Sequence, residues 1–208
     1  RELAAVAKGA HVRMVEDDPY WLLADAPPPP IASFAPSHVY YISTLSKCLT
    51  PGLRVAFVLV RDPQELERFL AALRSFALMA APLSAALATQ WILDGSADQL
   101  LAGVRKEARL RHTIARAVLA GHYDGAGEGL HVWLTLPAYW QASQLARAAD
   151  SEGIAVTPAE AFATSADAVN AIRISLGSVP DRDRLQAALQ RLSRLLARRP
   201  EAFHPAVV

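Results

Sequence analysis

Three side chains that can carry out covalent or acid–base chemistry follow two predicted strands of this sequence. Asp17 and Tyr20 stand in "EDDPYW", and Lys47 stands in "TLSKCLTPGLR". A lysine amine can form a Schiff base with an aldehyde, a carboxylate can keep a ring nitrogen protonated, and a phenol can hydrogen-bond a neighbouring oxygen. Because open parallel sheets bind ligands at the carboxyl ends of their strands, we expect these three side chains to share one edge of a sheet.

Two hydroxyls and a guanidinium accompany Lys47 in the sequence. Thr44 and Ser46 stand just before it, and Arg54 follows on the other side. Such groups hold a phosphate through short hydrogen bonds and a forked charge contact. Together with the amine, the carboxylate and the phenol, they fit pyridoxal 5′-phosphate, with Lys47 as the catalytic residue that attaches the cofactor.

The elements that must position these residues form an α/β layer. After an opening helix that Gly9 ends, strands are predicted within 11–21, at 39–44 and at 54–60. Their near-continuous apolar character is typical of strands buried on both faces of a largely parallel sheet. A helix is predicted over 63–77, and a longer helical stretch follows over 83–122, with a break signal, "DGS", at 94–96.

A smaller α/β unit is predicted after these helices. Its strands are "GLHVWLTLP", "IAVTP" and "AIRISLG", and a helix over 141–150 lies between the first two. The last helix places Ser178 and Asp181 at capping-box spacing. Four leucines then lie along one face of that helix, as in a helix packed on a core: Leu185, Leu189, Leu192 and Leu196.

Composition excludes several classes of protein. The 208 residues are 52% hydrophobic with a formal net charge of +1, so neither a nucleic acid nor an acidic partner is indicated. The basic residues at 105–116 are predicted to form a solvated helix face. We find no signal peptide or membrane span and expect a cytoplasmic protein. The six histidines show no metal-ligand spacing, and the single cysteine, Cys48, is expected to be small, buried and unreactive.

At the motifs quoted above the sequence resembles the fold type I, aspartate-aminotransferase-like family. The resemblance implies that Asp17 pairs with the pyridine nitrogen of the cofactor and that Tyr20 contacts its 3-oxygen. It also implies that Lys47 attaches the cofactor and that three neighbours bind its phosphate: Thr44, Ser46 and Arg54. "NAIRISLG" is similar to the family segment whose arginine, here Arg173, binds the α-carboxylate of the substrate.

The resemblance further implies a C-terminal part of a fold type I transferase. Residues 1–94 would be the remnant of a three-layer αβα large domain, and residues 95–208 the interdomain helix and a small domain. The ring-stacking residue, a glycine-rich phosphate contact and an asparagine would precede Arg1, so the chain looks like part of something longer. Two alanines, Ala56 and Ala159, stand where the family usually or frequently has glycine.

Three functions remain open at this stage. The sequence looks most like the C-terminal domain of MocR-type transcription regulators, in which a winged helix of the GntR class precedes an aminotransferase-like domain that senses pyridoxal phosphate or an amino compound. DNA would then bind only to an upstream domain. The alternatives are an aminotransferase acting on an α-amino acid and a decarboxylase or lyase. Family members are dimers, so a homodimer is expected.

Overall fold

The structure is a computed structural model that describes residues 1–124, 127–165 and 169–199. It comprises two compact units, a first unit of Arg1–Arg105 and a second unit of Lys106–Val208. Each unit contains its own sheet, of three strands in the first and four in the second. Among the described residues, no helix is long and apolar enough to cross a membrane.

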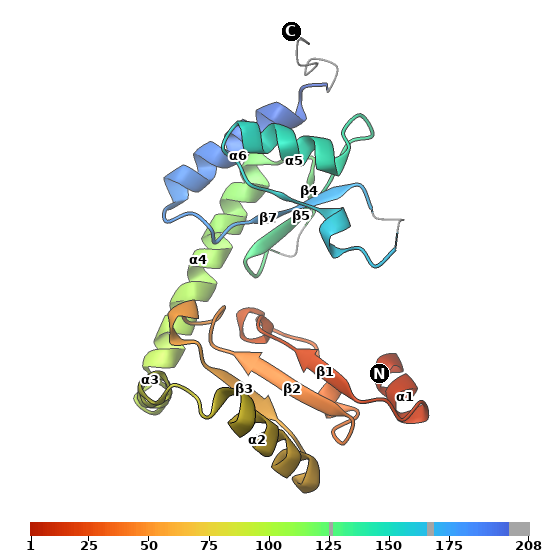
Figure 1. The fold of residues 1–208 in the computed structure, drawn as a ribbon. Helices are drawn as coiled ribbons and strands as arrows, with labels where there is room; N and C mark the ends of the chain where they lie inside the picture. The colour runs from red at the N-terminus through yellow and green to blue at the C-terminus, as the bar shows by residue number, and fades with distance from the viewer. Residues whose placement is uncertain (125–126, 166–168, 200–208) are drawn as a thin grey trace. The chain divides into compact units, whose positions relative to one another are not determined.

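The first unit contains a short opening helix, three strands, three 3-10 turns and two further helices (Figure 1). In chain order these are α1 (Glu2–Gly9), β1 (Met14–Asp17), η1 (Trp21–Leu23), η2 (Ile31–Ser33), β2 (Val39–Thr44), η3 (Pro51–Leu53), β3 (Ala56–Leu59), α2 (Pro63–Ala77) and α3 (Pro82–Leu93). The predicted helix over 63–77 is confirmed, and the predicted break at 94–96 separates α3 from α4 (Ser96–Val118), which contributes residues to both units.

The sheet of the first unit has the order β1-β2-β3 and is mixed. β1 and β2 are parallel, and Asp17 lies beside Ile42. β2 and β3 are antiparallel, so the prediction of a largely parallel sheet is wrong for β3. The reason is the connection: residues 45–55 form only a turn and η3, whereas a parallel return needs a crossover element. The prediction of strands buried on both faces is also wrong: β3 is exposed along all four residues, β1 alternates between half-buried and exposed, and only Val39 of β2 is buried.

Helix α2 contacts this sheet without a fully buried face, since none of its residues is buried and its Phe69 ring lies 6.3 Å from the Tyr40 ring of β2. Asp62 caps the helix by accepting from the amides of Gln64 and Glu65. The Glu65 carboxylate then accepts from Tyr40 of β2 at 2.5 Å and from Arg13 at 3.1 Å. The Glu65 carboxylate therefore joins α2 to β2 and to the segment before β1.

The second unit packs a four-stranded sheet against helices (Figure 1). Its remaining elements are β4 (Tyr123–Asp124), β5 (His131–Thr135), α5 (Ala142–Ser151), β6 (Thr157–Pro158), η4 (Ala159–Phe162), β7 (Ala171–Ser175) and α6 (Arg182–Leu196). The strand order is β4-β5-β7-β6, and each of the three pairings is antiparallel. The predicted strands and helices of this unit are thus confirmed, with ends that differ by a few residues.

One face of this sheet forms the principal core. Val132 and Leu134 of β5 and Ile172 and Ile174 of β7 are buried there, together with residues of α4, α5 and α6. The predicted leucine face of α6 is confirmed, because all four leucines are buried. The predicted capping box is wrong: Asp181 itself is the N-cap and accepts from the amide of Arg184, while Ser178 donates to the carbonyl of Ser175.

The basic part of α4 is not a uniformly solvated face, which corrects a further prediction. Arg111 is buried and donates at 2.8 Å to the carbonyls of Leu176 and Val179. Arg105 is half-buried and donates to the carbonyls of Leu22 at 2.7 Å and Ala24 at 3.2 Å. The charge pattern could not predict these contacts of Arg111 and Arg105, because helical periodicity carries no information about carbonyls in distant parts of the chain.

Candidate active site

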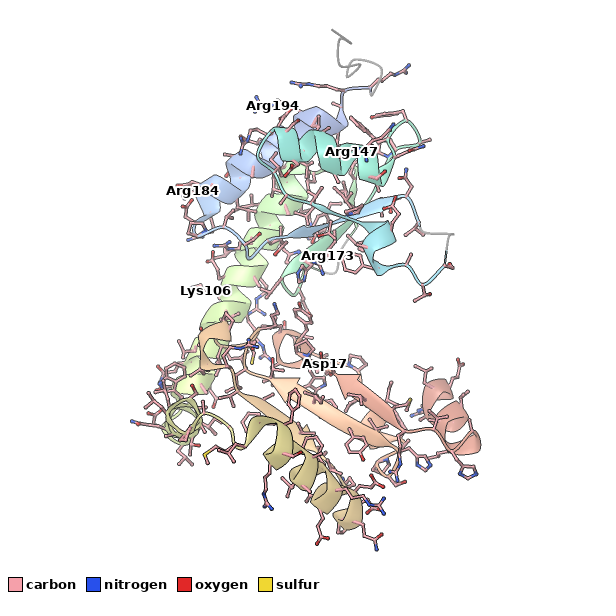
Figure 2. All side chains as sticks on the ribbon, viewed as in Figure 1. Asp17, Lys106, Arg147, Arg173, Arg184 and Arg194 are labelled. Carbon is pink, nitrogen blue, oxygen red and sulfur yellow. The ribbon has the colours of Figure 1, made fainter. Side chains whose placement is uncertain are left out.

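The predicted site residues of the first unit follow the carboxyl ends of β1 and β2. Asp17 is the last residue of β1 and is exposed (Figure 2), while the amide of Asp18 donates to the carbonyl of Ile42 in β2 at 2.9 Å. This parallel pairing sets the strand ends side by side. The two loops that carry Tyr20 and Lys47 therefore start from adjacent positions.

Tyr20 and Lys47 lie close together. The Lys47 ammonium nitrogen is 6.0 Å from the centroid of the Tyr20 ring, and both side chains are exposed. An amine that follows the half-buried strand β2 in this way reaches water, which removes the desolvation cost of its charge. Tyr20 is itself the N-cap residue of η1, whose Leu23 amide donates to the Tyr20 carbonyl at 2.8 Å.

A helical turn follows β2 and presents Lys47. The amides of Leu49 and Thr50 both donate to the carbonyl of Leu45, at 3.0 and 3.1 Å. At the start of this turn the Ser46 amide donates to the Thr44 hydroxyl oxygen at 3.2 Å. The Thr44 hydroxyl hydrogen is not used in that bond, so it can be donated to a ligand.

Cys48 lies on the inner side of the same turn. Its side chain is 1% exposed, and its thiol donates to the Thr44 carbonyl at 3.4 Å. Burial raises the pKa of the Cys48 thiol, which disfavours the reactive thiolate. The prediction of a buried cysteine is confirmed, and its low reactivity stays a prediction that the raised pKa supports.

Arg54 stands at the return from this turn into β3. Across the ladder, the Leu45 amide donates to the Val55 carbonyl at 3.2 Å, and Thr44 pairs with Ala56. These contacts bring the backbone of Arg54 beside the turn that carries Ser46. Among the described residues, the exposed Arg54 guanidinium makes no hydrogen bond or ion pair within the chain.

The Arg54 backbone adopts the left-handed conformation, with φ 51° and ψ 39°. Residues other than glycine rarely adopt it, at a cost of about 1–2 kcal/mol. The conformation follows η3, in which Thr50 accepts from the Gly52 amide and the Arg54 amide donates to Pro51. An arginine kept where glycine would be less strained points to a requirement for the guanidinium.

The two alanines that replace family glycines require no special backbone. Neither Ala56 nor Ala159 has a positive φ, so glycine's conformational freedom is not needed at either position. Ala56 is exposed in β3, and Ala159 is buried at the start of η4. Both methyl groups are accommodated without displacing a predicted site residue from its element.

Arg173 lies in the second unit, in the middle of β7 (Figure 2). It pairs with Trp133 of β5 and with Thr157 of β6, so these three residues share the sheet face opposite the core. Its guanidinium carbon is 4.6 Å from the centroid of the Phe162 ring. Its Nε is buried and has no hydrogen-bond partner among the residues that the structure describes.

Two residues near the site carried no signal in the sequence. Arg105 holds the carbonyls of Leu22 and Ala24, the end of the turn that begins at Tyr20, across more than eighty residues of chain. Phe162 stacks on Arg173. Phe162 ends the segment in which Ala159 replaces a frequent family glycine, but the sequence predicted no role for Phe162 or for a contact of Arg105, and only the folded chain brings each to its partner.

An apolar cavity elsewhere in the first unit has a volume of about 270 Å³. Its lining includes Trp21, Ala32, Val39, Tyr41 and Leu59. None of the predicted site residues lines it. Ser33 and Arg61 also line it, but no lysine does, so it offers no amine to attach an aldehyde cofactor and the strand-end cluster remains the candidate active site.

Known proteins show where this architecture occurs. The structure superposes on the α-aminoadipate aminotransferase LysN of Thermus thermophilus, solved in complex with N-(5′-phosphopyridoxyl)-L-leucine, with a TM-score of 0.79 and 28% identity. The match covers 94% of this chain and 53% of LysN. The chain has the fold of the fold type I aminotransferases. It corresponds to a C-terminal part of that fold, as the motifs predicted.

Two curated relatives match the chain in sequence, one a transcriptional regulator and the other a transaminase. The chain is 32% identical over 198 residues to an uncharacterised HTH-type transcriptional regulator, YdeF of Bacillus subtilis, covering 94% of this chain and 43% of YdeF. It is 30% identical over 194 residues to the 2-aminoadipate transaminase of Thermus thermophilus, covering 88% and 48%. The chain thus spans about half the length of the curated relatives it matches. No family model matches the sequence.

Proposed function

We propose that the chain is the pyridoxal-phosphate-binding, aminotransferase-like effector domain of a MocR-type transcription regulator. The observation that carries this proposal is the 32% identity to an HTH-type regulator over almost the whole chain. In the proposal, a winged helix of the GntR class upstream of this region binds DNA, and the domain itself senses an amino acid or amine. The protein would act as a homodimer in the cytoplasm.

The side chains of the first unit support binding of this cofactor. Lys47 offers an exposed amine beside Tyr20, and Arg54 offers a guanidinium without a partner among the described residues. We assign cofactor attachment to Lys47, phosphate contacts to Arg54 and to the hydroxyls of Thr44 and Ser46, the ring-nitrogen contact to Asp17, and the 3-oxygen contact to Tyr20. Bound pyridoxal phosphate supplies an electron sink for reactions at the α-carbon of an amino acid.

Each assigned side chain has a separate task. Asp17 would keep the ring nitrogen protonated, and Tyr20 would donate its phenol hydrogen to the ring oxygen while shielding the Lys47 amine. Arg54 would bind the phosphate through a forked pair of N–H groups, which a lysine cannot reproduce. Arg173 of the second unit would bind the α-carboxylate of the amino compound.

Attachment at Lys47 can be tested directly on the full-length protein. The protein is incubated with pyridoxal phosphate, reduced with borohydride, digested and mapped by mass spectrometry. We expect the phosphopyridoxyl group on the peptide that contains Lys47, unchanged labelling in Lys106→Arg and loss of labelling in Lys47→Arg. Labelling of another lysine, or of none, would refute the assignment.

Arg54 offers a second test because stability and cofactor binding should respond in opposite directions. Arg54→Gly relieves the left-handed backbone, so the free energy of unfolding should stay constant or rise by about 1 kcal/mol. Loss of the phosphate contact should weaken cofactor binding by about 1.5–3 kcal/mol, roughly tenfold or more. A variant that is less stable yet binds the cofactor normally would assign Arg54 a structural role instead.

The alternative is an aminotransferase acting on an α-amino acid, favoured by the 30% identity to a transaminase. Two measurements on the full-length protein separate the proposals. Sequence-specific DNA binding that changes with an amino compound supports the regulator. Steady conversion of amino acids with a 2-oxo acid as acceptor, without DNA binding, supports the enzyme, and release of carbon dioxide or ammonia would indicate a decarboxylase or lyase.

A further inference from the structure

The sheet of the second unit has one packed face and one open face, and Arg173 lies at the centre of the open face. The packed face buries Val132, Leu134, Ile172 and Ile174. On the open face, Trp133, Arg173 and Thr157 stand in a row across three strands. Trp133 keeps 36% of its surface exposed, so the row is accessible within this unit.

Phe162 comes to this row from a different element. It ends η4 and is 45% exposed, and its ring lies 5.9 Å from Trp133 and 4.6 Å from the Arg173 guanidinium carbon. The three side chains therefore form one cluster, in which the Phe162 ring contacts Trp133 at a tilted angle of 60° and faces the Arg173 guanidinium. A guanidinium over an aromatic face is attracted by the negative face of the ring.

The hydrogen bonds of Arg173 show which nitrogens of its guanidinium can still bind a ligand. Among the described residues, its buried Nε has no hydrogen-bond partner. The two terminal nitrogens differ from Nε, because neither is both buried and unpaired. Because no contact within the described residues occupies the terminal nitrogens, they remain available in solvent. The packing against Phe162 thus leaves Nε without a hydrogen bond, and it leaves the two terminal nitrogens free to bind an anion.

We infer that Phe162 is the positioning residue of Arg173: its ring holds the guanidinium so that the terminal nitrogens face the carboxylate of the amino compound. This inference rests on the proposed function for the identity of the anion. Phe162 acts through Arg173 and makes no polar contact of its own. Removal of the ring should therefore weaken recognition of the carboxylate and leave other parts of the ligand unaffected.

A matched pair of probes isolates the carboxylate contact. 3-Phenylpropanoate carries a carboxylate, and 3-phenylpropanamide has the same shape without the charge. Neither has an amine, so neither can react with a bound cofactor. Affinities are measured by calorimetry on the full-length protein loaded with pyridoxal phosphate, and the ratio of the two affinities measures the contact with Arg173.

The expected results distinguish positioning from a structural role. Phe162→Leu should lower the affinity for the carboxylate about fivefold, the loss of one cation–π contact, with the affinity for the amide unchanged. Phe162→Tyr, which keeps the ring, should restore the carboxylate preference. An equal loss for both probes, or an unchanged ratio in Phe162→Leu, would overturn the inference.

Arg173→Met separates this inference from the proposed function. Its effect should be to abolish the carboxylate preference. If it does so while Phe162→Leu leaves the ratio intact, the inference fails and the carboxylate role of Arg173 stands. If the unmodified protein shows no preference, or if Arg173→Met retains it, both the carboxylate role and the inference are refuted. Urea midpoints for each variant verify that the second unit is folded.

Discussion

Arg111 joins α4 to the chain between β7 and α6, and Arg111→Met removes that joint while keeping the length and apolar volume of the side chain. Its Nη1 donates at 2.8 Å to the carbonyls of both Leu176 and Val179, and its Nη2 donates to Pro180 at 3.3 Å. Its Nε donates to Glu107 at 2.8 Å. Methionine can make none of these bonds.

The cost can be worked out from these contacts. Glu107 is 41% exposed, so it regains water and contributes little to the loss. The carbonyls are buried or half-buried, and each short bond from a charged donor contributes about 1.5–3 kcal/mol. Two such bonds predict destabilisation of the second unit by about 3–6 kcal/mol, a large share of the stability of a small domain.

Hydrogen exchange read by mass spectrometry resolves this loss within the second unit. Peptides from β7 report opening of the second unit, and a loss of about 3–6 kcal/mol accelerates their exchange by about a hundredfold to about twenty-thousandfold. Arg194→Met is the matched control, because Arg194 is exposed on α6 of the same unit (Figure 2). Arg111→Lys should lie between them, since one ammonium cannot replace a forked donor.

Exchange in β7 of Arg111→Met that stays within about fivefold of the unmodified chain would contradict the predicted destabilisation, because fivefold corresponds to about 1 kcal/mol. An equal effect of Arg194→Met and Arg111→Met would also contradict it. Either result would mean that water replaces the guanidinium at the three carbonyls, and that α4 is held to the second unit by its apolar residues.

Three further predictions concern stability and association. His112 is buried with Nδ1 2.8 Å from the Tyr123 hydroxyl, and burial lowers the pKa of its imidazole. Because the unfolded chain then binds the proton more readily, the free energy of unfolding should fall as the pH drops below about 6.5. His112→Gln should remove that part of the pH dependence in urea titrations. Leu192→Ala, at a fully buried position of α6, should cost about 2–5 kcal/mol in the same titration, whereas a loss below 1 kcal/mol would contradict the packing of this core. The 208-residue chain should self-associate in light scattering, because Phe76 and Leu93 are 94% and 81% exposed, and serine at both positions should reduce the association; a strictly monomeric chain would contradict this expectation.

Local patterns in the sequence were sufficient to predict most elements of both units. The helix over 63–77 begins at Pro63 after the capping residue Asp62, and both signals are local. The leucine face of α6 could be predicted because helical periodicity alone sets which residues share a face. The strand-end positions of Asp17 and Lys47 could be predicted from apolar runs that stop at polar residues. The motifs around these two residues also predicted the aminotransferase fold.

Tertiary structure alone decided which distant groups meet. β3 is antiparallel to β2 because residues 45–55 are too short a connection for the crossover that a parallel strand requires. The four residues of β3 do not themselves determine the direction in which the strand pairs. Arg111 and Arg105 were expected in solvent, yet each binds carbonyls that lie far away in the sequence. The same holds for Phe162 beneath Arg173: periodicity reports which way a side chain faces on its own element, but hydrogen bonds and ring contacts between elements exist only once the chain has folded.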